Sequence, residues 1–223
     1  MPTPTLYPSF GPKEHSHLII KLILAFIMHI ALVNIQIPDA NAAPLAIKNQ
    51  ARQNIKLGNS QQALAILDKY SQNAGADSEF FFLKARALQD LRRNTDALAN
   101  YSIAIYLNPK YLMAIINRGL VKGALKDLDG ALMDLNLALT LQPNNPAALL
   151  NRGVTYGGLN QPLLAIADFN RIIQLDPNNA DAFRNRGLTK HLMGDKSSAC
   201  IDWARSKDLG IAEASEWIAT LCK

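Results

Sequence analysis

The sequence predicts an all-α protein in which five pairs of helices follow one another and one further helix ends the chain. Three Leu-x-Pro runs, which end at Pro109, Pro143 and Pro177, stand 34 residues apart. Small residues recur at the same interval in two series, which are Ala63, Ala97, Ala131, Ala165 and Ala199, and Ala51, Ala85, Gly119, Gly153 and Gly187. No insertion interrupts either series, so one unit is repeated five times.

Apolar residues within one unit predict two helices joined by a turn. Between residues 112 and 124 they recur at helical spacing, residues 127–130 break the pattern, and a second helical run extends over 132–141. Gly119 is expected to face Ala131 across the pair, because side chains this small let two backbones approach closely. The proline that follows ends the second helix, since its ring disfavours helical geometry in the residue before it.

The period of 34 residues, the helix pair, the small residues and the final proline together resemble the tetratricopeptide repeat. The resemblance implies a right-handed α-α superhelix with units at residues 43–77, 78–111, 112–145, 146–179 and 180–210, and a capping helix at 211–223. In family terms, the large apolar positions are Phe81, Ile115, Leu149 and Phe183 on the first helices and Tyr101, Leu135, Phe169 and Trp203 on the second. Gly75 and Ile211 replace the family's proline, so the end units are interpreted as caps.

The start of the chain is typical of a secretory signal peptide. A polar, mildly basic stretch over residues 1–21 precedes an apolar run at 22–33, and Ala40-Asn41-Ala42 offers a cleavage motif. Cleavage would remove residues 1–42 and place the protein in a periplasm, a thylakoid lumen or the medium. The alternative is an uncleaved anchor over residues 18–37, the chain's one expected contact with a membrane, which would make the protein a membrane-anchored structural subunit of an envelope or thylakoid complex.

The chain is basic, with a net charge of +5 and an isoelectric point near 9.2. Such a balance can indicate nucleic-acid binding, but the cations are not gathered in one run and an exported chain rarely meets nucleic acid, so no nucleic-acid partner is expected. Acidic protein surfaces, anionic lipid head groups or envelope polymers suit the charge better. The alternative is that modest basicity only aids solubility.

Three Asn-Arg-Gly runs predict a ladder of ion pairs. An aspartate follows each of their arginines by 16 residues, and in an antiparallel helix pair those two offsets lie at the same height. The expected pairs are Arg118 with Asp134, Arg152 with Asp168, and Arg186 with Asp202, or the same aspartates with the arginine of the next unit. A structural role is favoured over chemistry. Lys84 and Asn100 interrupt the ladder, so the second unit should be held less firmly.

The chain's two cysteines, Cys200 and Cys222, stand at similar heights on two antiparallel helices joined near Gly210. Packed helices lie about 8–10 Å apart, which brings the two Cα atoms within the range of a disulfide. Export would permit such a bond. Cys200 also occupies the position of Leu64, Leu98, Leu132 and Ile166, so it could instead be a small core residue. If the bond forms, it ties the final helix to the last pair.

The family resemblance implies that the first helix of each unit lines a concave groove. The expected lining is Lys48, Arg52 and Lys56 in the first unit, Glu79, Phe82 and Arg86 in the second, Met113, Ile116 and Leu120 in the third, Ala147, Leu150 and Val154 in the fourth, and Asp181, Arg184 and Leu188 in the fifth. The groove would be apolar in the middle and basic at its first end. The lysine, asparagine and arginine positions that hold a peptide carboxylate in some relatives are not matched. An apolar partner segment fits such a groove best; the alternative is that some of these residues pack against the chain itself.

An enzyme is the class that the sequence favours least. Residues 43–223 carry one histidine, His191. They carry no glycine-rich phosphate loop, no paired carboxylates on an apolar face, and no set of cysteines and histidines at metal spacing. We expect no catalytic residue, no metal and no cofactor. The Asn-Arg-Gly runs and residues 199–203 also resemble those of cyanobacterial tetratricopeptide proteins, some of which help to assemble photosynthetic complexes. The expected function is a non-catalytic interaction scaffold, an exported adaptor or assembly factor whose partner protein the sequence does not name.

Overall fold

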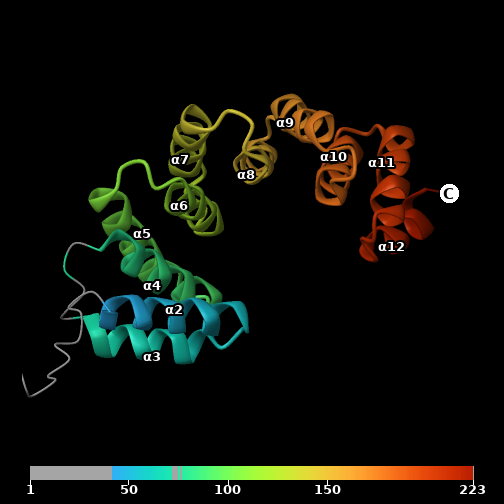
Figure 1. The fold of residues 1–223 in the computed structure, drawn as a ribbon. Coiled ribbons are helices and arrows are strands. Elements are labelled where there is room, and N and C mark those ends of the chain that lie inside the picture. Colours follow the sequence, from blue (N-terminus) through green and yellow to red (C-terminus); the bar gives the residue numbers. More distant parts are fainter. Residues whose placement is uncertain (1–41, 72–74, 76, 223) are drawn as a thin grey trace, which may run out of the picture. The chain divides into compact units, whose positions relative to one another are not determined.

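The computed structural model describes residues 42–71, 75 and 77–222, and every regular element among them is a helix (Figure 1). The chain divides into two units, Met1–Ala43 and Pro44–Lys223. No helix among the described residues is long and apolar enough to cross a bilayer. The alternative anchor at residues 18–37 lies outside the described part. The helices are α2 (Ala42–Lys56), α3 (Ser60–Tyr70), α4 (Ser78–Asp90), α5 (Asn94–Leu107), α6 (Leu112–Ala124), α7 (Leu128–Leu141), α8 (Pro146–Gly158), α9 (Pro162–Leu175), α10 (Ala180–Leu192), α11 (Lys196–Asp208) and α12 (Glu213–Leu221).

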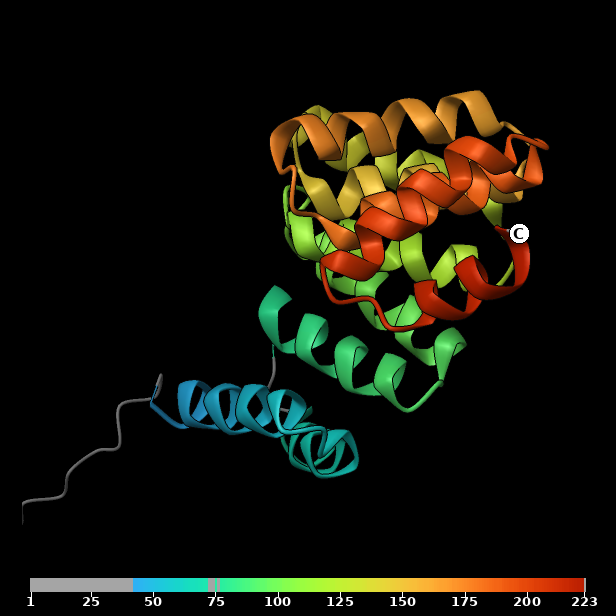
Figure 2. The ribbon, with the colours of Figure 1, turned by 90° about the vertical axis from the view of Figure 1, so that its right-hand side faces the viewer.

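The helices of the larger unit form a right-handed α-α superhelix of five pairs and a cap, as expected. Helices α4 and α5, α6 and α7, α8 and α9, and α10 and α11 pack as pairs, and the second helix of each pair packs on the next first helix. Helix α12 packs against α11 after the last pair (Figure 1, Figure 2). Second helices begin at residues 60, 94, 128, 162 and 196, which keeps the interval of 34.

The turn inside each pair contains one residue with left-handed backbone geometry at a constant offset. These residues are Gly58, Arg92, Lys126, Asn160 and Gly194, with φ between 57° and 88°. Glycine adopts this region without strain, whereas a Cβ atom makes it less favourable. The turn is therefore dictated by the repeat, and Arg92 and Lys126 adopt it against their own preference.

Lys126→Gly is expected to stabilise the fold by about 0.5–1 kcal/mol, since it relieves the left-handed strain at φ +68°. The measurement is the urea midpoint followed by circular dichroism. Gly194→Lys is the matched reverse change at the same offset, and it should lower the midpoint. Equal midpoints for all three proteins would contradict the strain argument.

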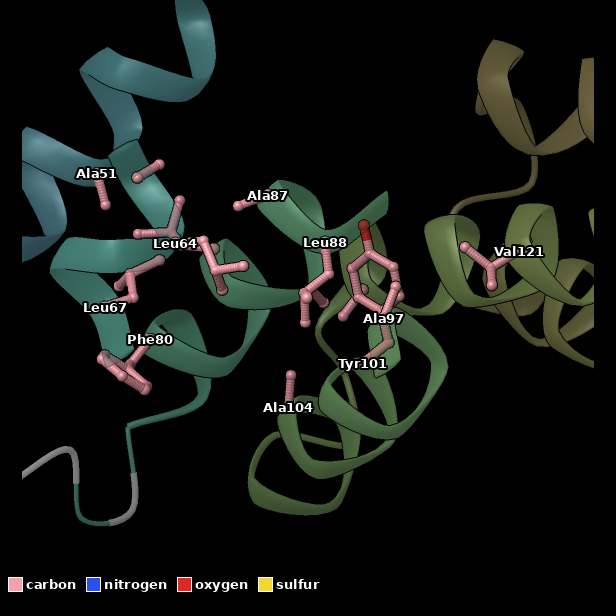
Figure 3. Packing of buried hydrophobic residues seen from close by; sticks show 14 residues of the cluster. Ala51, Leu64, Leu67, Phe80, Ala87, Leu88, Ala97, Tyr101, Ala104 and Val121 are labelled. Carbon is pink, nitrogen blue, oxygen red and sulfur yellow. The ribbon is translucent and has the colours of Figure 1, made fainter. Parts of the chain in front are cut away.

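The core lies inside and between the helix pairs, in clusters that meet along the chain. Figure 3 shows the first cluster, to which Ala51 and Leu64 of the first pair and Leu88 and Tyr101 of the second all belong. The large residues of the second helices, Tyr101, Leu135, Phe169 and Trp203, are at most 1 % exposed.

Each Asn-Arg-Gly glycine lies beneath the large residue of its own second helix. A Cβ atom built at Gly119 would stand 3.1 Å from Leu135, at Gly153 2.5 Å from the ring of Phe169, and at Gly187 2.7 Å from the ring of Trp203. The backbone oxygen of Ala131 would lie 3.4 Å from a Cβ atom at Gly119. The large side chains occupy the space that a Cβ atom would need, most closely at Gly153 and Gly187.

Candidate functional site

Exposed apolar residues recur along the first helices at the interval of the repeat. Leu120 on α6, Val154 on α8 and Leu188 on α10 stand at one offset and are 42 %, 52 % and 40 % exposed. Helix α8 contacts both α6 and α10, so the three positions lie on neighbouring helices. Met113 on α6 is also exposed, and Leu150 on α8 is half-buried. We call Met113, Leu120, Leu150, Val154 and Leu188 the apolar stripe.

Two predicted members of the groove pack inside the fold. Ile116 is only 2 % exposed and belongs to the core cluster that contains Ile115 and Leu135, so its placement on an open lining was wrong. The reason is that α6 is covered by both α7 and α8. Phe82 is half-buried, with its ring 4.9 Å from that of Tyr111, and contributes mainly to packing.

The predicted basic end is a charge-compensated cluster. Lys48 on α2 binds Asp77 at 2.7 Å and Glu79 at 3.2 Å, and Arg52 also pairs with Glu79. The prediction of a basic surface at this end was therefore wrong for Lys48 and Arg52, because two carboxylates at the start of α4 neutralise them. Lys56 is exposed and Arg86 is half-buried. Farther along, Arg184 pairs with Asp181 at 2.9 Å, and Ala147 is exposed.

The electrostatics of this cluster lower the pKa of both carboxyl groups. Burial alone would raise the pKa of Asp77 and of Glu79, but hydrogen bonds from Lys48 and Phe80 N–H to Asp77, and from Arg52 and Lys48 to Glu79, outweigh it. The hydrogen bond to Asp77 raises the pKa of Lys48. Burial, with the charge of Glu79, also raises the pKa of nearby Tyr111 to about 12.

Stability is expected to fall in acid because of this cluster. Groups whose pKa is lower in the folded state stabilise it above their unfolded pKa, near 4, and lose this contribution as the pH falls through the folded value. The thermal midpoint, measured between pH 6 and pH 2.5, should therefore decrease. Lys48→Met should show a smaller decrease, because it removes the cation that binds Asp77 and one of the two that bind Glu79. The same slope in both proteins would mean that other carboxylates determine the acid response.

The ladder of ion pairs forms within each of three units. Arginines 118, 152 and 186 each donate from Nε and Nη2 to both oxygens of the aspartate 16 residues later, at 2.5 to 2.9 Å. The three aspartates, Asp134, Asp168 and Asp202, are at most 5 % exposed. The third guanidinium nitrogen of each arginine, Nη1, is its third arm and donates a hydrogen bond to the preceding unit. The acceptors are Ser102, Asn136 and Asn170 respectively.

The second unit forms a different rung of this ladder. Lys84 occupies the arginine position but pairs with Asp68 of the preceding unit at 2.8 Å. Asn100, in the aspartate position, bonds only the backbone of its own helix, at Asp96. A cavity of about 260 Å³ is lined by all four of these residues. It lies where the other units have an arginine fork, that is, an arginine that donates two hydrogen bonds to one aspartate. The cation therefore still joins two units, while the bond within its own pair is lost.

The C-terminal cap is closed by a disulfide. Cys200 on α11 and Cys222 after α12 are bonded, with their Cα atoms 5.8 Å apart, which is the first of the two alternatives that the sequence left open. The rings of Trp203 and Trp217 lie 5.5 Å apart beside this bond. Trp217 continues the series Phe81, Ile115, Leu149 and Phe183 at the same interval of 34, a signal that sequence reasoning missed.

Residues with catalytic potential do not assemble into a site in the described part. His191 is half-buried, with its ring 5.4 Å from that of Trp203 and its buried Nδ1 without a hydrogen-bond partner there. The backbone N–H of Ser198 donates a hydrogen bond to Oδ1 of Asp195, the residue that caps α11. Over residues 42–71, 75 and 77–222, no group of histidines, cysteines and carboxylates could hold a metal ion.

A second apolar surface, which the sequence reading did not single out, lies on the outer side of α7. Met133, Leu137 and Leu141 recur every four residues and are 73 %, 41 % and 38 % exposed. Their helical spacing could have identified them, because the buried residues Ala131, Leu135 and Ala138 lie on the opposite face of α7.

Comparisons with known proteins support the fold. The profile of the tetratricopeptide repeat family matches residues 146–179. Among solved structures, TTC0263, a thermophilic tetratricopeptide repeat protein of Thermus thermophilus, is 20 % identical, with a TM-score of 0.68 over 80 % of this chain and 98 % of that one. YrrB, a tetratricopeptide repeat protein with an unusual peptide-binding site, is 19 % identical, with a TM-score of 0.63 over 78 % of this chain and 91 % of its own. The MamA fragment from residue 41 of Desulfovibrio magneticus RS-1 is 21 % identical, with a TM-score of 0.66 over 74 % and 93 %. None of the curated proteins matches the chain.

Proposed function

We propose that this chain, which has the fold of tetratricopeptide repeat proteins and matches their profile over residues 146–179, is a non-catalytic scaffold that binds an apolar segment of a partner protein along the apolar stripe. The observation that carries the proposal is the exposure of Leu120, Val154 and Leu188 at one offset of three neighbouring helices. Exposed apolar residues that gather on one surface are a feature of interaction sites. The peptide-binding site of YrrB agrees with this class of partner.

The spacing of the stripe suggests the conformation of the bound segment. Packed helices lie about 8–10 Å apart, so each step from Leu120 to Val154 to Leu188 covers about that distance. A polyproline II segment advances about 3.1 Å per residue and returns to the same face every third residue, after about 9 Å. We therefore expect the partner to be extended, with apolar residues at every third position.

Polar residues beside the stripe limit where the segment can lie. The Arg184–Asp181 pair stands on α10, one helical turn before Leu188, and the Arg52–Glu79 pair joins α2 to α4, before the first residue of the stripe. These charges are already compensated by their partners and contribute little to the attraction of a charged ligand. The partner is consequently selected by apolar residues rather than by net charge.

The test is selection from a random peptide library displayed on phage. The wild-type protein should enrich peptides with apolar residues three positions apart, and Leu120→Asp with Val154→Asp should abolish binding of the enriched peptides. Met133→Asp with Leu137→Asp is the matched control, since both residues are exposed leucine or methionine side chains on α7. Circular dichroism verifies that all proteins keep their helical content. Peptides that bind both double variants equally would refute the stripe as the site.

We further propose that the protein is an exported adaptor or assembly factor. The cleavage motif Ala40-Asn41-Ala42 supports export, and the Cys200–Cys222 bond suits an oxidising compartment. Edman sequencing of the protein from its native membrane and soluble fractions tests this. A first residue near Ala43 is expected, whereas a start at Met1 or Pro2 in the membrane fraction would favour the anchored structural subunit.

A further inference from the structure

We propose that the Cys200–Cys222 disulfide is a redox-controlled latch. Its reduction by a protein dithiol releases α12 and uncovers the face of α11 that carries Trp203. The bond lies at the end of the superhelix and involves no residue of the apolar stripe.

Helix α12 has few means of holding its place without the bond. It has nine residues, and Ala214 is its one fully buried side chain. Trp217, Ile218 and Leu221 are half-buried, while Glu213 and Glu216 face solvent. Helices shorter than about 12 residues are marginal in water unless tertiary packing supports them. The covalent link at Cys222 therefore keeps the far end of α12 against α11.

The surface of α11 that α12 covers corresponds, in the other units, to the surface of the second helix that packs on the following first helix. Leu135 and Phe169 lie in one core cluster with Ala148, Leu149 and Ala182 of the following first helices. Trp203 holds the equivalent position on α11 and is 1 % exposed because α10 covers its ring at Gly187 and His191, and α12, which stands where a following first helix would stand, covers it at Trp217. Once α12 leaves, this surface presents a large aromatic residue to an amphipathic helix with one bulky apolar side chain at the place of Trp217.

The position of the bond makes the exchange feasible. Cys200 and Cys222 are both half-buried rather than sealed in the core, and they belong to the small outer cluster around Trp203. A thiolate of the dithiol attacks one sulfur and forms a mixed disulfide, and the other cysteine leaves as a thiolate and takes up a proton. The second thiol of the reductant then closes its own disulfide and releases the first cysteine as a thiol. The reductant loses two electrons and two protons, and the cysteine pair gains them.

The experiment uses the two tryptophans of the chain, Trp203 and Trp217, which both lie at this site. The full-length protein is treated with dithiothreitol or with a thioredoxin-type dithiol until a thiol assay counts two free thiols. We expect a red shift of tryptophan emission and a several-fold rise in acrylamide quenching, with almost unchanged helical ellipticity. Reoxidation should restore both signals. Cys200→Ser with Cys222→Ser should show the exposed signals with or without reductant, and Trp217→Phe isolates the response of Trp203.

Three results would overturn the proposal. Complete reduction with unchanged quenching would mean that α12 stays docked without the bond. Loss of most of the helical ellipticity on reduction would make the disulfide a general support of the fold rather than a latch. A bond that the dithiol protein leaves intact in the folded state, while dithiothreitol reduces it in urea, would exclude a redox role.

Discussion

Asp168→Ala is expected to lower the free energy of unfolding by about 3 kcal/mol, because it leaves the Arg152 guanidinium without the carboxylate that accepts two of its hydrogen bonds. Asp168 is 5 % exposed, so water replaces the lost partner poorly. Arg152 would retain one bond, from Nη1 to Asn136. The loss should appear in urea unfolding and as faster amide exchange in α8 and α9.

Asn100→Ala is the matched control for this change, since Asn100 stands at the same offset of the second unit and bonds only the backbone oxygen of Asp96. A cost below about 1 kcal/mol is expected for it. Similar costs for the two variants would mean that the arginine fork adds no stability beyond that of an ordinary side chain at this offset. The converse change, Lys84→Arg with Asn100→Asp, would build the missing fork in the cavity of the second unit.

Gly153→Ala and Gly157→Ala are expected to have effects of opposite sign, although the two glycines lie four residues apart on α8. A Cβ atom at Gly153 would stand 2.5 Å from the ring of Phe169, whereas at Gly157 it would meet nothing within 4 Å. The first variant should lose about 2 kcal/mol through overpacking. The second should gain up to about 1 kcal/mol, since alanine favours the helix.

The measurement for this pair is the thermal midpoint, with each variant compared with the wild type. Gly187→Ala provides a second test of the same contact, because its Cβ atom would stand 2.7 Å from Trp203. It should destabilise the fold as Gly153→Ala does. A stabilised Gly153→Ala variant would show that the ring of Phe169 moves aside without cost, and that the small residue is not required by packing.

Much of the fold could be predicted because the constraints act within a short stretch of chain. The interval between repeats determines where each helix begins, and the offset of 16 residues brings Arg152 and Asp168 to one height in an antiparallel pair. The same reasoning about height applied to Cys200 and Cys222, which are bonded. Each of these features can be predicted from the geometry of two helices joined by one turn.

The remaining features depend on how one pair packs on the next, which periodicity does not encode. Ile116 has the helical offset of a lining residue, yet α8 covers it. Lys48 meets Asp77 and Glu79 only because α4 returns beside α2 after the first pair. The bonds from arginines to Asn136 and Asn170 likewise require the arrangement of successive pairs.

The third arm of each arginine has a consequence for how a partner is discriminated. Since Arg152 and Arg186 hold both their own pair and the preceding one, the step from one first helix to the next is set before any ligand arrives. For the proposed extended partner, this step fixes the spacing at which its apolar residues must occur. A peptide with one residue inserted between two apolar positions would lose contact with every later helix, and its affinity would fall more than its hydrophobicity predicts.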